Sequence, residues 1–114
     1  MLKLERKLFD ELEGYKTYTN DIMLDGKKIG RADIIVAPEE KTDEVYLEWI
    51  GIDEEYRGQG FGTQVIRMLV EEFKFLYFAA CDEQNAKFYS RIGEEYSGEN
   101  DQVDQGYGIY FIEK

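Results

Sequence analysis

A glycine-rich turn between two apolar segments is the feature that most constrains how this chain can fold. Residues 55–66 read EYRGQGFGTQVI and hold three glycines and one arginine within six positions. An apolar run, EVYLEWIGI, precedes the turn, and apolar residues at helical spacing follow it. Glycine loses more backbone entropy on folding than other residues, so its accumulation indicates unusual dihedral angles or the close approach of another group. The turn therefore predicts either a tight strand-to-helix connection or an anion held by backbone N–H groups at the start of a helix.

The composition predicts one globular domain over residues 1–114 with a strongly acidic surface. Hydrophobic residues make up 43% of the chain and aromatic residues 15%, which is enough for a folded core. The formal net charge of −11 argues against nucleic acid or an anionic membrane as a partner and is compatible with cationic partners. The acids gather in residues 43–56 and 93–106. We interpret them as either a solvated face or a docking surface for an amine or a basic protein.

The chain lacks the residues for several kinds of chemistry. Cys81 is its one cysteine and it has no histidine, which excludes an intrachain disulfide, a Cys–His pair and a typical zinc site. The first residues, MLKLERKLFDELEG, are too charged for a signal peptide, and no run is long enough for a membrane-spanning helix. We therefore expect a soluble, cytoplasmic protein without a bound metal.

The opening segment is ambiguous between strand and helix. Leu2, Leu4 and Leu8 alternate as in a strand, whereas Leu4, Leu8, Phe9 and Leu12 fit one face of a helix. Because Glu, Lys and Leu favour helix, we predict a short helix here.

The remaining pattern predicts a mixed α/β fold, in which a β-meander of three strands is followed by helix, strand, helix and strand. The segments YKTYTNDIML and KKIGRADIIVA flank Asp25-Gly26, a strong hairpin signal, and EVYLEWIGI has the pattern of a central strand. An amphipathic helix follows the glycine turn, and FKFLYFAAC is typical of a short buried strand. A second helix can begin at an Asp82 cap and end at Gly93, and GYGIYFIEK is the last strand.

The glycine spacing does not match two well-known phosphate-binding loops. A Walker loop requires Gly-Lys-Ser/Thr, but Gly62 is followed by Thr63 and Gln64. The dinucleotide fingerprint requires its third glycine at the position of Thr63. The residues around the turn are therefore needed to predict its function.

That context resembles the GNAT superfamily, the coenzyme-A-dependent N-acyltransferases. The family's acyl-CoA-binding pattern is Arg or Gln, two residues, Gly, one residue, and Gly or Ala. Arg57, Gly60 and Gly62 match it within GIDEEYRGQGFGTQVI, between a strand and a helix. A second segment, DEQNAKFYSRIG, resembles the family's later helix, with Asn85 near its start and Tyr89 in its middle. The resemblance runs from about Glu44 to Gly93 of this chain.

The resemblance implies a central mixed β-sheet flanked by helices and acetyl-CoA as the cosubstrate. Backbone N–H groups of the turn would hold the pyrophosphate, because local amides outweigh the distant, screened charge of the chain. In the family two central strands splay, and the one that here ends at Ile52 binds the pantetheine arm. A backbone N–H there would polarise the thioester carbonyl. The implied cofactor-binding residues are Gly51, Ile52, Arg57, Gly58, Gln59, Gly60, Phe61, Gly62, Thr63 and Asn85.

Tyr89 is the candidate general acid. It lies where the family often places the group that protonates the departing thiolate, and a phenol suits that leaving group. The alternative is a buried aromatic residue on a helix face, packed beside Phe88.

Glu48 is the candidate general base, since the chain has no histidine. It is an acid in an apolar strand, where burial would favour its protonated form, and strict alternation places it on the same face as Ile50 and Ile52. One alternative is an exposed position that tolerates charge. In another, Asp53 and Glu54 attract the amine, which loses its proton through water.

The acceptor half of the family's domain is reduced in this chain. The two helices that usually follow the first strand have almost no sequence here, because residues 14–25 leave room only for a strand. We expect an N-acetyltransferase that moves the acetyl group from acetyl-CoA to a primary amine, either a small cationic molecule or a protein lysine. A second protomer could complete the site in a homodimer. The alternative is a non-catalytic acidic protein on the same scaffold, an inhibitor or decoy that occupies a basic surface.

Overall fold

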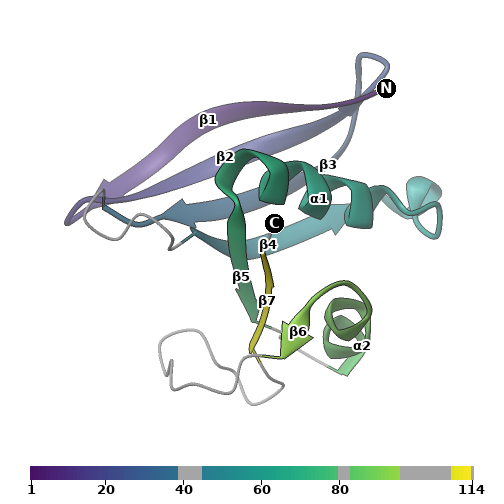
Figure 1. Cartoon of the computed structure of the whole chain (residues 1–114). Helices are drawn as coiled ribbons and strands as arrows, with labels where there is room; N and C mark the ends of the chain where they lie inside the picture. The colour runs from purple at the N-terminus through teal and green to yellow at the C-terminus, as the bar shows by residue number, and fades with distance from the viewer. Residues whose placement is uncertain (39–44, 80–82, 96–108, 114) are drawn as a thin grey trace.

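In the described part of the chain, the fold is a single twisted sheet with two α-helices on one face (Figure 1). The computed structural model describes residues 1–38, 45–79, 83–95 and 109–113, and at residues 79, 84, 85, 94, 95 and 109 it describes the backbone alone. Within these ranges seven strands are ordered β1-β2-β3-β4-β5-β7-β6. The strands are β1 (Leu2–Leu12), β2 (Tyr15–Leu24), β3 (Lys27–Val36), β4 (Val45–Ile52), β5 (Phe75–Ala79), β6 (Glu94–Glu95) and β7 (Ile109–Glu113). The predicted mixed α/β class is confirmed.

The first four strands form an antiparallel meander, in which tight turns connect β1 to β2 and β2 to β3. The predicted hairpin at Asp25-Gly26 is confirmed, with φ of 49° and 85° at its two central residues. Glu13-Gly14 turns in the same way, with φ of 54° and 86°. Positive φ at both positions gives the turn a twist that matches the right-handed twist of the flanking strands.

The prediction of a helix for the opening segment is wrong, because residues 2–12 form strand β1. Every residue from Leu2 to Leu12 except Phe9 pairs with β2 in antiparallel register. The helix propensity of Glu, Lys and Leu is worth only tenths of a kcal/mol per residue. Backbone hydrogen bonds to β2, together with side-chain packing across the two strands, outweigh that preference.

Both helices bury their apolar sides against the same face of the sheet. Helix α1 (Phe61–Phe73) and helix α2 (Glu83–Ile92) contribute to one core cluster. The ring of Tyr89 in α2 lies 4.5 Å from that of Phe78 in β5, and Phe78 is the register partner of Leu47 in β4. We call this face, which also carries Ile34 and Leu47, the helix face, and the opposite one the far face. Neither described α-helix covers the far face.

On the helix face, the Arg6 side chain links β1 to α1. Its guanidinium donates to both carboxylate oxygens of Glu72, and it lies over the ring of Phe73 with 5.1 Å to the centroid. Its Nε donates to Oδ1 of Asn20 at 2.7 Å. Asn20 is fully buried and donates through Nδ2 to the carbonyl oxygen of Ala32 at 3.0 Å. One arginine thus satisfies a buried amide and holds an edge strand in place.

Arg6→Met is therefore expected to lower the free energy of unfolding by about 2 kcal/mol, because Oδ1 of Asn20 would remain buried without its donor. Urea denaturation followed by circular dichroism measures the change. Lys7→Met is the matched control, since the Lys7 side chain is exposed and a surface change of this kind stays within about 0.5 kcal/mol. Equal effects of the two substitutions would contradict this role of Arg6.

Candidate functional site

The site forms where β4 separates from β5. The two parallel strands pair over only two registers, Tyr46 with Tyr77 and Leu47 with Phe78. Residues 49–52 of β4 continue to pair with β3 but have no partner in β5. In a strand, backbone N–H and C=O groups point alternately to the two sides, so this edge of β4 presents backbone polar groups that no described strand pairs with.

A short 3-10 helix, η2 (Glu54–Tyr56), and the glycine turn connect β4 to α1. Gly58 and Gly60 have φ of 78° and 83°, a region that glycine adopts without strain. A Cβ atom at either position would meet nothing among the described residues within 4 Å, so the space in front of the turn is open. Gly60 is the N-cap of α1 and has no side chain to cap this end. The first N–H groups of α1 are therefore free to hold an anion.

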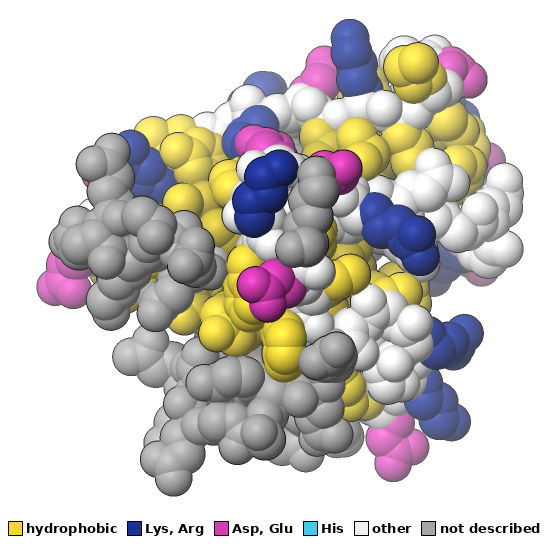
Figure 2. Space-filling model, viewed as in Figure 1, with side chains coloured by type: hydrophobic (Ala, Val, Ile, Leu, Met, Phe, Trp, Pro, Cys, Tyr) yellow, Lys and Arg dark blue, Asp and Glu magenta, His cyan; other side chains and the backbone are white. Residues whose placement is uncertain are grey.

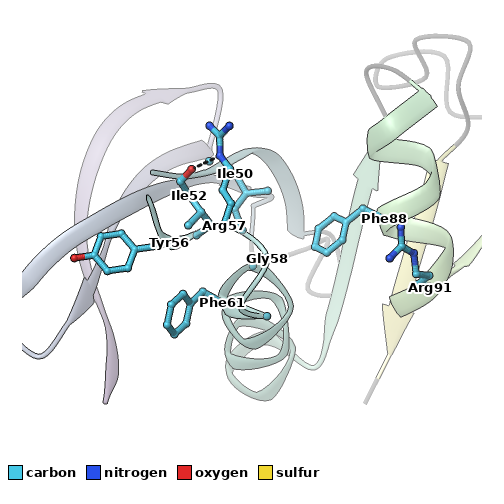
Figure 3. Close-up of a pocket in the computed structure, with 11 residues that line it drawn as sticks. Ile50, Ile52, Tyr56, Arg57, Gly58, Phe61, Phe88 and Arg91 are labelled. Atoms are coloured by element: carbon cyan, nitrogen blue, oxygen red, sulfur yellow. Dashed lines mark hydrogen bonds between the residues drawn. The ribbon is translucent and has the colours of Figure 1, made fainter. Parts of the chain in front are cut away.

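A cavity of about 470 Å³ joins the end of β4, the glycine turn and one side of α2 (Figure 3). Among the described residues of its lining, Arg57 and Arg91 are the charged ones and none is a carboxylate. Arg57 donates through Nε to the carbonyl oxygen of Ile52 at 2.7 Å, so its side chain is held against the end of β4. The lining consists of Ile50, Gly51, Ile52, Tyr56, Arg57, Gly58, Gly60, Phe61, Gly62, Phe88 and Arg91.

Charged side chains of both signs lie near the glycine turn. On the face shown in Figure 2, basic and acidic side chains are interspersed. Lys27 lies beside the turn, with Nζ 5.3 Å from the ring centroid of Tyr56 and 3.6 Å from a carboxylate oxygen of Glu55. Tyr56 first, and then Glu55, raise the pKa of Lys27, so this cation stays charged at neutral pH.

Seven of the predicted cofactor-binding residues come together in the cavity lining: Gly51, Ile52, Arg57, Gly58, Gly60, Phe61 and Gly62. Gln59 and Thr63 belong to the same turn and helix start but do not line the cavity, and the Gln59 amide donates to the carbonyl oxygen of Glu55 at 3.5 Å. Asn85 falls in the first turn of α2, and its side chain is outside the described part of the structure. Asp82, the expected cap of α2, is outside the described residues as well.

Tyr89 lies beside the cavity rather than in its lining. Its side chain is 4% exposed and packs against Phe78, with Tyr110 6.2 Å away and Phe88 5.5 Å away between ring centroids. Phe88 is the aromatic residue of α2 that lines the cavity. The role of Tyr89 as a proton donor stays a prediction.

A β-bulge changes the predicted position of Glu48. Leu47 pairs with Ile34 and Trp49 pairs with Asp33, so Glu48 is an extra residue in β4. A bulge breaks the alternation of side chains. Ile50 therefore stays on the helix face, whereas Glu48 is exposed on the far face. The expectations that Glu48 shares a face with Ile50 and Ile52 and sits in an apolar environment are wrong, and its role as a base stays a prediction.

Glu48 lines a second cavity, of about 300 Å³, on the far face. Arg31 lies there with Nε 3.1 Å from Oδ1 of Asp33 and its guanidinium 4.7 Å from the ring of Trp49. That carboxylate oxygen is buried and accepts no hydrogen bond from the described residues, because the Arg31 N–H is close enough for an ion pair but not aligned with it. The lining is Phe9, Asp10, Thr17, Thr19, Arg31, Asp33 and Glu48.

Sequence reasoning missed four residues of the main cavity: Ile50, Tyr56, Phe88 as a lining residue, and Arg91. The available signal for Arg91 was its position three residues after Phe88, which puts both side chains on one side of α2.

Neither α1 nor α2, the α-helices in the described ranges, is long and apolar enough to cross a membrane.

Comparison with known proteins agrees with this geometry. Residues 2–93 match the model of the Acetyltransferase (GNAT) family. No curated protein matches the sequence. Among solved structures, GCN5 from Tetrahymena is 12% identical with a TM-score of 0.65, covering 85% of this chain and 68% of that one.

Two further solved structures are similar. The first is a variant of the AtaT toxin bound to the C-terminus of the antitoxin AtaR (15% identity, TM-score 0.60, 87% of this chain and 66% of that one). The second is a GNAT family acetyltransferase from Elizabethkingia anophelis with acetyl-CoA bound (12% identity, TM-score 0.57, 89% of this chain and 77% of that one). At these identities the likeness shows the fold, and this chain spans about two thirds of the length of the toxin and of GCN5.

Proposed function

The chain belongs to the GNAT acetyltransferase family, and we propose that it transfers the acetyl group of acetyl-CoA to a primary amine. The family, together with the acetyl-CoA bound in a structural relative, supports acetyl-CoA as the cosubstrate. The observation that carries the proposal is the joining of an open glycine turn and an unpaired strand edge in one cavity whose described lining holds no carboxylate. This arrangement fits a molecule with a phosphate end and an amide-bearing arm.

Each part of the cavity has a separate task in this proposal. The N–H groups at the start of α1 and the Arg57 guanidinium hold the pyrophosphate. The free edge of β4 forms backbone hydrogen bonds with the amide groups of the pantetheine arm, in the way that it would pair with another strand. This directs the thioester toward Gly51 and Ile52. A backbone N–H there stabilises the oxyanion that forms when the amine attacks, and acetyl-CoA supplies the activated acyl group.

We propose that the amine approaches from the far face. The described lining of the cavity there carries Asp10, Asp33 and Glu48 against one cation, Arg31, so it attracts a positively charged acceptor. Glu48 is two residues from Ile50 along β4, or roughly 7 Å. At that separation Glu48 would take the proton of the attacking amine through a water molecule. A small cationic amine and a protein lysine both fit this chemistry.

Acetylation of an amine panel, detected by mass spectrometry, tests the proposed reaction. We expect a mass gain of one acetyl group on cationic amines, and a lower kcat in Glu48→Gln with little change in acetyl-CoA affinity. If the wild type binds acetyl-CoA and acetylates no amine, peptide or small molecule, catalysis is excluded and a binding function remains.

Tyr89→Phe tests the proposed general acid. Loss of a proton donor is expected to lower kcat by about a hundredfold without weakening acetyl-CoA binding. Tyr110→Phe is the matched control, because Tyr110 is also a buried tyrosine of the same aromatic cluster but belongs to β7, which contributes no described residue to the cavity lining. A similar loss in both variants would mean that packing of the cluster, rather than proton donation, sets the rate.

A second candidate function is a non-catalytic protein that binds a basic partner. The net charge of −11 and a far face that neither described helix covers favour it, and a structural relative, the AtaT toxin, is described bound to a protein segment. Binding of a basic protein that needs no acetyl-CoA and survives a charge introduced at Gly60 would support this candidate over the enzyme.

A further inference from the structure

Arg57 and Arg91 are the described arginines that line this cavity, and neither is paired with a carboxylate among the described residues. Arg6 pairs with Glu72 and Arg31 pairs with Asp33. For Arg91, the interaction found within the described ranges is Nε donating to the carbonyl oxygen of Lys87, one turn earlier in its own helix, at 3.3 Å. The remaining N–H groups of its guanidinium are left for another acceptor.

The position of Arg91 follows from the way α2 faces the glycine turn. A Cβ atom added to Gly62 would lie 3.4 Å from Cζ of Phe88, so this side of α2 is turned toward the start of α1. Arg91 follows Phe88 by three residues and lies on the same side, about 4.5 Å farther along the helix axis. Figure 3 shows Arg91 and Arg57 on opposite sides of the cavity, one on α2 and the other after β4.

The charge of this cavity is unusual for so acidic a chain. With 25 carboxylate residues against 14 basic ones, a random lining would be expected to include acids. Instead, the residues that the structure describes in the lining include two arginines and no carboxylate. A guanidinium binds phosphate through parallel N–H···O bonds, so two arginines in the lining of one cavity suit a ligand with several phosphate oxygens.

We infer that Arg91 binds a phosphate group of coenzyme A from the α2 side of the cavity, opposite Arg57. This inference rests on the proposed use of acetyl-CoA. The phosphate is either the pyrophosphate or the 3′-phosphate of the nucleotide, and both present the same chemistry to a guanidinium. Arg91 is a binding residue in this account and takes no part in the acyl transfer.

Arg91→Gln tests the inference by calorimetric titration with three ligands. These are acetyl-CoA, acetyl-dephospho-CoA, which lacks the 3′-phosphate, and acetyl-pantetheine, which lacks the nucleotide. We expect Arg91→Gln to weaken acetyl-CoA binding by about tenfold, because Arg91 is exposed and its phosphate contact is partly screened. Binding of acetyl-pantetheine should be unchanged. If the loss persists with the dephospho compound, the pyrophosphate is the partner, and if it disappears, the partner is the 3′-phosphate.

Lys87→Gln is the charge-matched control. Lys87 is exposed, belongs to the same helix and does not line the cavity. Arg91→Lys should retain part of the affinity, because it keeps the charge but loses the planar fork. The inference is overturned if Arg91→Gln and Lys87→Gln weaken acetyl-CoA binding equally, or if Arg91→Gln weakens all three ligands by the same factor. If the wild type itself does not bind acetyl-CoA, the proposed function fails rather than the assignment of Arg91.

Discussion

Gly60→Asp is expected to weaken acetyl-CoA binding by roughly a hundredfold, which corresponds to about 3 kcal/mol. The new carboxylate would stand at the N-cap of α1, in the open space where the pyrophosphate is expected to lie. Two like charges about 4 Å apart repel by about 4 kcal/mol at the effective dielectric constant of a protein surface. Isothermal titration calorimetry with acetyl-CoA measures the loss.

Two controls separate charge from backbone strain at Gly60. Gly60→Asn is almost the same size as the aspartate and tolerates positive φ equally well, so it should lose much less affinity. Gly26→Asp places the same residue at a glycine with φ of 85°, close to the 83° of Gly60, and with equally open surroundings. Because Gly26 lies in the β2–β3 hairpin and does not line the cavity, its substitution should leave binding nearly unchanged. Equal binding by Gly60→Asp and the wild type would mean that the turn holds no phosphate.

Gly30→Ala is expected to lower the free energy of unfolding by about 3 kcal/mol, at the upper end of the cost of overpacking. The new Cβ atom would lie 2.3 Å from the carbonyl oxygen of Gly51 and 3.1 Å from Cα of Ile52. Both are backbone atoms, which cannot rotate away, so β3 and β4 would have to move apart. Gly51 and Ile52 also line the cavity, and acetyl-CoA affinity should fall with stability.

Urea denaturation measures this effect, with Gly62→Ala as the comparison. A Cβ atom at Gly62 makes an ordinary contact of 3.4 Å with the Phe88 ring, and alanine is favoured over glycine within a helix. Gly62→Ala should therefore keep or raise the stability. An unfolding free energy of Gly30→Ala within about 0.5 kcal/mol of the wild type would show that the two strands are not in such close contact.

The parts of the fold that the sequence predicted are those with strong local signals. Asp25-Gly26 determined the β2–β3 hairpin because few dipeptides adopt positive φ at both positions so readily. The glycine turn and the apolar stripe after it located α1 for a similar reason. The opening strand was missed because its identity depends on pairing with β2, and Glu13-Gly14 is a weaker hairpin signal than Asp25-Gly26.

The parts of the site that the sequence did not predict depend on contacts between distant segments. The bulge at Glu48 exists only as a register difference between β3 and β4, so strict alternation placed this side chain on the wrong face. Arg91 joins the cavity because α2 is turned toward the start of α1, which follows from packing of Tyr89 and Phe88. The turn residues from Gly58 to Gly62 are contiguous in sequence, and a motif could therefore indicate them.

Titration of the ¹⁵N-labelled protein with acetyl-CoA, followed through its backbone amide resonances, shows which amides the cosubstrate contacts. We expect saturable shifts at the amides of Gly58, Gly60, Phe61 and Gly62, with a second group at Gly51 and Ile52. Hairpin amides such as that of Gly26 should not move. Shifts absent from the glycine turn, or a saturable response confined to other parts of the chain, would contradict the claim that this turn holds the phosphates of acetyl-CoA.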